Sequence, residues 1–125
     1  MNMKYLHIVI IFACTLLAFH ACSDDLLQSV DFIVLLDENN TYKAGDEVVF
    51  YFENAPDWVT FFSGEEGCIY PGGKGTCIKS ITEDLKKYSY KFEIPGTYNV
   101  VFLGGNTNYK GNKVKEKELN IVINE

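Results

Sequence analysis

The stretch that decides the fold is Asp46–Gly64, DEVVFYFENAPDWVTFFSG, because it contains two runs of alternating side chains. In the first run, Glu47–Glu53, one side of an extended chain carries Val48, Phe50 and Phe52. In the second run, Asp57–Ser63, the residues expected to face inward are Trp58, Thr60 and Phe62. A period of two in β-branched and aromatic residues predicts strands rather than a helix. Pro56 lies between the runs and lacks an N–H donor, so a corner or a crossover joins the two strands.

Runs of the same kind lie on both sides of this stretch. We predict further strands over Asp31–Asp37, Tyr88–Ile94, Thr97–Leu103 and Lys113–Asn124. The first is apolar on both sides, which predicts that both of its faces are covered. Between the strands, Thr82–Lys87 fits a single helical turn capped by Thr82 or Ser80, and Gly104–Asn112 fits a polar loop. This pattern predicts one all-β domain over residues 31–125, an antiparallel β-sandwich of about seven strands.

The composition is that of a folded, acidic domain. Hydrophobic residues make up 47% of the 125 residues, which excludes a disordered chain, and the formal net charge is −6. The sequence contains no arginine. Nucleic-acid phosphates are bound by clustered Lys and Arg, so this balance argues against nucleic acid as a partner.

The N-terminus has the pattern of an export signal. Lys4 precedes a mostly apolar run, Tyr5–Phe19, which is shorter than the roughly 20 residues of a membrane span. Residues 17–22, LAFHAC, resemble the lipobox of bacterial lipoproteins, with a small residue before the cysteine and an apolar residue three before it. The resemblance implies that residues 1–21 are a cleaved signal peptide and that Cys22 is acylated. Residues 22–30 would then be the acylated cysteine and a tether to the membrane.

The cysteine count agrees with acylation. Cleavage before Cys22 removes Cys14 and leaves three cysteines, an odd number in an exported protein. Acylation of Cys22 accounts for one and leaves Cys68 and Cys77 to pair. The alternative is a secreted protein in which Cys22 is a free thiol.

An acidic triplet follows the proposed anchor. Ser23, Asp24 and Asp25 resemble the export signal of surface lipoproteins in Bacteroidetes, which implies a position on the outer membrane facing the cell exterior. Short acidic runs are also ordinary solvated tethers, and that alternative stays open.

The segment Cys68–Cys77 fits a hairpin closed by a disulfide. If Gly72 and Gly73 form a two-residue turn, Cys68 lies opposite Cys77 at a non-hydrogen-bonded position, where the side chains approach closely. A metal site needs more ligands than two cysteines, and none are nearby in the sequence. We therefore predict a structural disulfide.

Two segments resemble the PKD-type domain, an immunoglobulin-like β-sandwich. Residues 61–67, FFSGEEG, preceded by Asp57 and Trp58, are similar to a strand and turn of that family. Gly96–Phe102 is similar to the family's penultimate strand and follows a Pro-Gly turn. The similarity spans residues 32–123 and is closer still to PKD-like domains of Bacteroidetes surface lipoproteins. It implies an immunoglobulin-like fold, in a family that includes parts of glycan-utilisation and adhesion proteins.

The chemistry expected of the mature chain is sparse. Both histidines, His7 and His20, leave with the signal peptide, which removes the usual general base and zinc ligand. We therefore predict no enzymatic activity and no cofactor. Three carboxylates, those of Asp57, Glu65 and Glu66, could gather at one end of the sandwich and bind Ca²⁺. The alternative, which we favour, is that these charged turns are solvated.

Outward-facing aromatic residues carry the functional hypothesis. Alternation or loop position places four of them outside: Tyr51, Phe61, Tyr70 and Tyr109. Such rings stack on sugars, whereas an outward apolar patch of Val59, Phe61, Val101, Leu103 and Val122 would bind a partner protein. The non-functional alternative is that the tether or the hairpin simply covers these aromatic and apolar residues. We expect a non-catalytic, lipid-anchored binding module for glycans or for outer-membrane proteins of a nutrient-uptake system. A structural or adhesive subunit that packs through its outer sheet face is the alternative.

Overall fold

The chain folds into an all-β domain. The computed structural model describes residues 30–37, 41–108 and 111–125, and these contain eight strands and no helix. In this part of the chain there is accordingly no apolar helix that could span a membrane. The strands are β1 (Ile33–Leu36), β2 (Tyr42–Lys43), β3 (Glu47–Glu53), β4 (Trp58–Phe62), β5 (Thr76–Lys79), β6 (Lys87–Lys91), β7 (Gly96–Asn108) and β8 (Gly111–Asn124).

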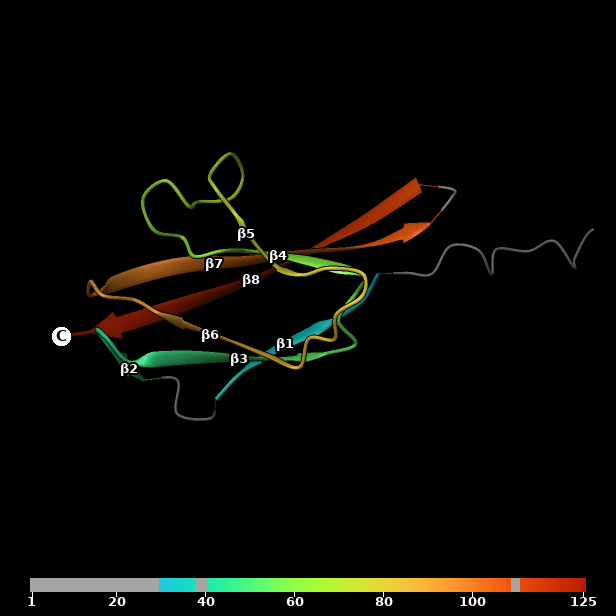
Figure 1. Ribbon diagram of the computed structural model, residues 1–125. Coiled ribbons are helices and arrows are strands. Elements are labelled where there is room, and N and C mark those ends of the chain that lie inside the picture. The colour runs from blue at the N-terminus through green and yellow to red at the C-terminus, as the bar shows by residue number, and fades with distance from the viewer. Residues whose placement is uncertain (1–29, 38–40, 109–110) are drawn as a thin grey trace, which may run out of the picture.

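Two sheets pack face to face and confirm the predicted β-sandwich (Figure 1). The smaller sheet has the order β1-β3-β6, and the larger one has the order β2-β8-β7-β4-β5. All pairs are antiparallel except β2–β8, in which two residues after the first turn run parallel to the end of the chain.

Phenylalanines fill the space between the sheets. The ring of Phe102 on β7 contacts those of Phe50 and Phe52 on β3, with centroid distances of 5.0 and 5.1 Å. All three side chains are buried, as the alternation in these strands predicts. Burying a phenylalanine stabilises a fold by about 1.5–3 kcal/mol, so this aromatic layer is a main contributor to stability. The buried core also contains Val30, Phe32, Tyr42, Val48, Val59, Phe61, Leu85, Phe92, Val100, Ile121 and Ile123.

Strand β4 faces the opposite way from the prediction. Val59 and Phe61 point into the core and are 0% and 2% exposed, whereas Trp58 and Thr60 lie on the outer face. The pattern was ambiguous because β4 is apolar on both sides. Its outer face is itself covered, since Phe62 packs against the ring of Tyr70 at 5.0 Å. This second buried layer also contains Val101, the partner of Phe62 in the sheet.

The predictions for β1 and β6 need smaller corrections. Only one face of β1 is covered: Ile33 and Leu35 are 43% and 47% exposed. The alternation over Tyr88–Ile94 is confirmed as far as Phe92, which is fully buried. The strand itself ends at Lys91, and Ile94 lies exposed beyond it.

The predicted loop Gly104–Asn112 is wrong. Pairing between β7 and β8 continues without interruption from Gly96 opposite Ile123 to Asn108 opposite Gly111. The result is a long hairpin whose tip projects beyond the sandwich (Figure 1). Glycine and asparagine suggested a loop, but Gly104 and Gly105 are strand residues whose missing side chains make room for neighbouring ones.

The predicted helical turn at Thr82–Lys87 is wrong as well. The segment is a tight turn in which Glu83 N donates to Ser80 O at 3.1 Å, followed by an extended chain. Leu85 anchors this chain in the core at 8% exposure. The side chain of Ser80 does not cap a helix; its hydroxyl donates to Glu83 Oε2 at 2.8 Å.

Candidate ligand-binding site

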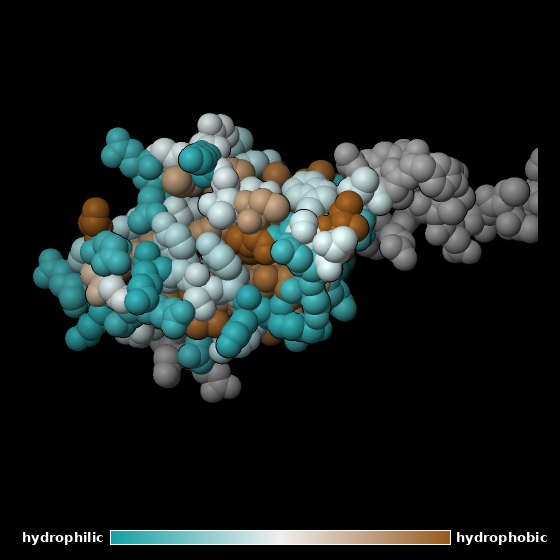
Figure 2. All heavy atoms as spheres, in the orientation of Figure 1, coloured by the Kyte–Doolittle hydropathy of each residue, from teal (hydrophilic) through white to brown (hydrophobic). Residues whose placement is uncertain are grey.

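A shallow pocket of about 390 Å³ lies beside the start of β4. Its walls come from the beginning of β4, the end of β5 and the turn that follows, and are formed by Trp58, Cys77, Lys79, Ser80, Ile81 and Thr82. In Figure 2, hydrophobic residues reach the surface at the end of the sandwich from which the hairpin projects. The size is within the range of small-ligand sites, and an apolar wall with a few polar groups is their usual composition.

Trp58 is positioned by the absence of a side chain on the neighbouring strand. Gly105 lies opposite Trp58, and a Cβ atom there would be 2.5 Å from Trp58 Cζ2 and 2.7 Å from Lys113 O. The indole therefore packs directly against the backbone of β7. Val114 is the next residue in the same row across the sheet and is 51% exposed. Together Trp58, Gly105 and Val114 form a flat apolar strip, which we call the Trp58 platform.

One of the residues that line the pocket, Lys79, has a buried ammonium group. Lys79 is only 6% exposed, and its Nζ donates to Asp57 O at 3.0 Å and to Ser80 O at 3.4 Å. Since an ammonium has three N–H donors, one remains for another acceptor. In the described ranges, no carboxylate lies within 4.0 Å of this Nζ.

The Ser80–Glu83 turn fixes the rim of the pocket. Glu83 Oε2 accepts hydrogen bonds from Ser80 N at 2.9 Å and from Ser80 Oγ at 2.8 Å. These bonds, aided by the Lys79 charge, hold the pKa of the Glu83 carboxyl below its usual value of 4.5. The turn presents Ile81, which is 65% exposed, next to the pocket.

The carboxylates proposed for calcium do not come together. Asp57 binds β7 close to the hairpin tip, with its Oδ2 accepting from Thr107 N at 2.9 Å and its N donating to Asn106 Oδ1 at 3.0 Å. Glu65 lies beyond the other end of β4, roughly 20 Å away by the rise of a strand. Among the described residues, no three His, Cys, Asp or Glu side chains gather into a metal-binding group. Asp57 and Glu65 therefore do not form the shared group that the calcium hypothesis required.

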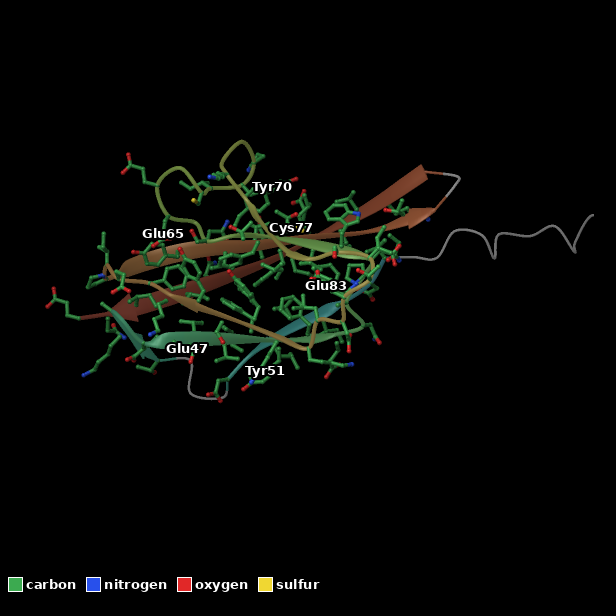
Figure 3. All side chains as sticks on the ribbon, viewed as in Figure 1. Glu47, Tyr51, Glu65, Tyr70, Cys77 and Glu83 are labelled. Carbon is green, nitrogen blue, oxygen red and sulfur yellow. The ribbon has the colours of Figure 1, made fainter. Side chains whose placement is uncertain are left out.

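Glu65 instead connects the two sheets. Its Oε2 accepts hydrogen bonds from Ser63 Oγ at 2.9 Å and from the hydroxyl of Tyr90 on β6. Partial burial, together with the bond to Glu65, raises the pKa of Tyr90 to about 12 from the ordinary value of 10.0. The loop after β4 is thereby fastened to the smaller sheet, and Figure 3 shows Glu65 at this end of the sandwich.

Replacing Tyr90 with phenylalanine tests this connection. At neutral pH the loss of a hydrogen bond to a carboxylate is expected to lower the free energy of unfolding by about 1.5–3 kcal/mol. A raised pKa stabilises the fold below pH 10, and that contribution is lost as the pH rises to about 12. The difference between wild type and Tyr90→Phe should therefore shrink from pH 10 to about 12. Urea unfolding across this range measures it, and a constant difference would contradict the assignment.

The predicted disulfide is not formed, because the hairpin that it required has another register. Gly73 N donates to Ile69 O at 2.7 Å and Lys74 N to Gly67 O at 2.7 Å, so Cys68 is not opposite Cys77. The loop that precedes β5 contains a cis peptide bond before Pro71. Cys77 pairs with β4, opposite Thr60, and both thiols are free.

The four aromatic residues expected on the surface differ in where the structure places them. Tyr51 is exposed at 45%, and Figure 3 shows it on the opposite side of the sandwich from Tyr70. Tyr70 is half-buried and covers Phe62, with its hydroxyl donating to Glu116 Oε1 at 2.8 Å. Phe61 is in the core, and Tyr109 lies outside the described residues.

The expected apolar patch is also wrong, since Val59 and Val101 are fully buried and Leu103 is half-buried. Of its members only Val122 is well exposed, at 51%. The residues expected to direct export and anchoring, Cys22, Ser23, Asp24 and Asp25, lie outside the described part of the chain.

The pocket itself was missed by sequence reasoning. Trp58 was assigned to the core because of the face expected for β4, and Lys79 and Ile81 carry no motif. The available signal was the pair Gly104-Gly105 at the end of an apolar strand. In a β-sheet, glycine often marks a close approach of another group, and here the approaching group is an indole.

The fold and the pocket define an all-β sandwich with a shallow apolar site on one outer face. Its sequence matches the profile of the family described as Domain of unknown function (DUF5017) over residues 21–124, and the chain belongs to that family. A search of the curated proteins and a search of the solved structures both found no match.

Proposed function

We propose that this protein is a non-catalytic, lipid-anchored module that binds glycans at the Trp58 platform on the outside of a bacterial outer membrane. The observation that supports this proposal most directly is the half-buried indole of Trp58, which packs on Gly105 beside a shallow pocket. It would serve a nutrient-uptake system by holding polysaccharide close to the membrane proteins that import it.

A sugar ring suits this pocket for chemical reasons. One face of a pyranose carries mainly C–H groups and packs against an aromatic face, while its edge carries hydroxyl groups that need hydrogen-bond partners. Trp58 supplies the face, and Ser80, Thr82 and the spare donor of Lys79 supply polar groups at its edge. The same aromatic ring is already fixed in place, so little side-chain entropy is lost on binding.

The membrane anchor is supported by the sequence. The lipobox-like segment ends at Cys22, and the family match begins at Ala21, so it includes Cys22 and leaves out the apolar run before it. Several acyl chains at roughly 0.8 kcal/mol per buried methylene would hold the chain stably. The acidic triplet Ser23-Asp24-Asp25 and the PKD-like segments support a Bacteroidetes surface lipoprotein.

A Trp58→Ala variant tests glycan binding. We expect at least one member of a panel of neutral and acidic polysaccharides to retard the wild-type domain in affinity gel electrophoresis. Loss of a tryptophan anchor costs about 2 kcal/mol or more, or roughly thirtyfold in Kd, so retardation should vanish. Ile81→Asp should act in the same direction at the rim. Tyr51→Ala on the opposite sheet should bind like wild type, and failure of every polysaccharide to retard the wild type would contradict the proposal.

A second candidate function is supported by the outer face of the smaller sheet. Ile33, Leu35 and Tyr51 are each more than 40% exposed, and Leu35 lies directly opposite Tyr51. Such a face fits a structural or adhesive subunit that packs against a partner protein. Leu35→Lys separates the two functions: it should abolish self-association or partner binding through this face and leave the Trp58 platform intact.

A further inference from the structure

The β7–β8 hairpin carries a row of lysines along one face. Lys113, Lys115 and Lys117 alternate along β8 and so point to the same side, which is the side that faces the core further along the strand. Lys117 Nζ lies 3.4 Å from Asp31 Oδ1 and 5.8 Å from the ring centre of Phe32. Lys113 and Lys115 are exposed, and in the described ranges neither has a carboxylate within 4.0 Å.

The same end of the domain receives the N-terminal tether. The contact between Asp31 and Lys117 places the start of the domain against the base of the hairpin, and Figure 1 shows the chain entering at the end from which the hairpin projects. From Lys117 to Gly111 at its tip, the strand extends roughly 20 Å at 3.4 Å per residue.

The tether is short by comparison. Cys22 is nine positions before Asp31. Even when fully extended, nine residues span at most about 30 Å. The roughly 20 Å of hairpin is therefore comparable to the greatest distance that the tether can span. An anchored domain would bring the hairpin tip to the membrane surface.

We infer that the Lys113–Lys115 face of the β7–β8 hairpin contacts the phosphate headgroups of the membrane that holds the Cys22 acyl chains, and so orients the domain. The inference rests on the proposed acylation of Cys22. Charge complementarity favours it, since these lysines lack carboxylate partners among the described residues and the rest of an acidic chain with net charge −6 is repelled by an anionic surface. Val114 of the Trp58 platform lies between these two lysines but on the other face of β8, so the platform then faces away from the contact.

Lysine footprinting on anchored protein tests the inference without depending on natural acylation. The chain from Cys22 onward, carrying Cys68→Ser and Cys77→Ser, is coupled through Cys22 to a maleimide phospholipid. It is then incorporated into phosphatidylcholine vesicles with or without phosphatidylglycerol, and amine acetylation is followed by mass spectrometry. Each membrane-bound lysine contributes about fivefold in binding, so acetylation of Lys113 and Lys115 should slow about fivefold or more in the anionic vesicles. Lys43 and Lys91, on β2 and β6, are internal controls whose rates should not change.

The outcomes separate this inference from the proposed function. Equal acetylation rates in anionic vesicles and in detergent would overturn it. Slow acetylation of Lys113 and Lys115 in neutral vesicles as well would also overturn it if the double variant Asp24→Asn/Asp25→Asn restored fast acetylation. In that case the lysines would be binding the chain's own acidic segment and not the membrane. The proposed anchor is tested elsewhere, by the mass of the N-terminal peptide of protein isolated from cell membranes, where an unmodified Cys22 would contradict it.

Discussion

Replacement of Phe61 by alanine is expected to lower the free energy of unfolding by about 3–5 kcal/mol. The ring of Phe61 lies between the two sheets, with centroid distances of 5.0 Å to Tyr88, 5.0 Å to Tyr90 and 5.3 Å to Phe102. The side chain is 2% exposed, and its removal leaves a cavity among aromatic rings that cannot collapse without moving both sheets. Urea unfolding monitored by circular dichroism should show a midpoint about 2 M lower.

Tyr51→Ala is the matched control for Phe61→Ala. It removes an aromatic ring from the neighbouring sheet, but one that is 45% exposed and lies on the outer face. A surface substitution of this kind changes stability by about 0.5 kcal/mol. Equal midpoints for Phe61→Ala and Tyr51→Ala would show that β4 presents its other face to the core, as the sequence pattern had suggested.

Gly105→Ala is expected to displace Trp58 and to abolish ligand binding while the fold persists. A Cβ atom at position 105 would overlap the indole and the backbone carbonyl of Lys113, so the tryptophan must leave its place on β7. Overpacking of this size costs about 1–3 kcal/mol. Because the protein contains a single tryptophan, its fluorescence reports the displacement directly, and the emission should shift to longer wavelength as the ring enters water.

Gly104→Ala provides a steric control on the neighbouring residue. Its Cβ atom would be 2.7 Å from Pro56 Cγ and 2.8 Å from Phe32 Cε1, which lie on the inner side of the sheet. The expected loss of stability is similar, but the tryptophan emission and the polysaccharide retardation should match wild type. Wild-type emission and binding in Gly105→Ala would show that the glycine does not position Trp58.

Sequence patterns predicted the fold best where a strand has one apolar side. The alternation in β3 and in the first half of β7 places Phe50, Phe52 and Phe102 in the core as expected. It failed for β4, because this strand is apolar on both sides and a two-sided pattern does not identify the core face. It also failed for Gly104 and Gly105, because local composition signals a turn whereas long-range packing requires small residues there.

The candidate site was less predictable because its parts are brought together only by tertiary structure. Trp58 was recognised as aromatic but assigned to the wrong face, and Lys79 belongs to an unremarkable segment. The carboxylates of Asp57 and Glu65 were recognised in the sequence as parts of charged turns, but their hydrogen-bond partners could not be predicted. Neither the bond from Tyr90 to Glu65 nor that from Thr107 to Asp57 follows from spacing, since 25 and 50 residues separate the two members of each pair.

One edge strand of the larger sheet, β5, bears on how copies of this domain associate. An unpaired strand edge is a template on which another chain can add a strand, and short edges with buried charges are known ways to prevent it. β5 is only four residues long and ends in Lys79, whose ammonium lies inside the protein and holds two backbone carbonyls. An incoming strand would meet a short edge that ends in a buried charge, and both features disfavour aggregation through β5.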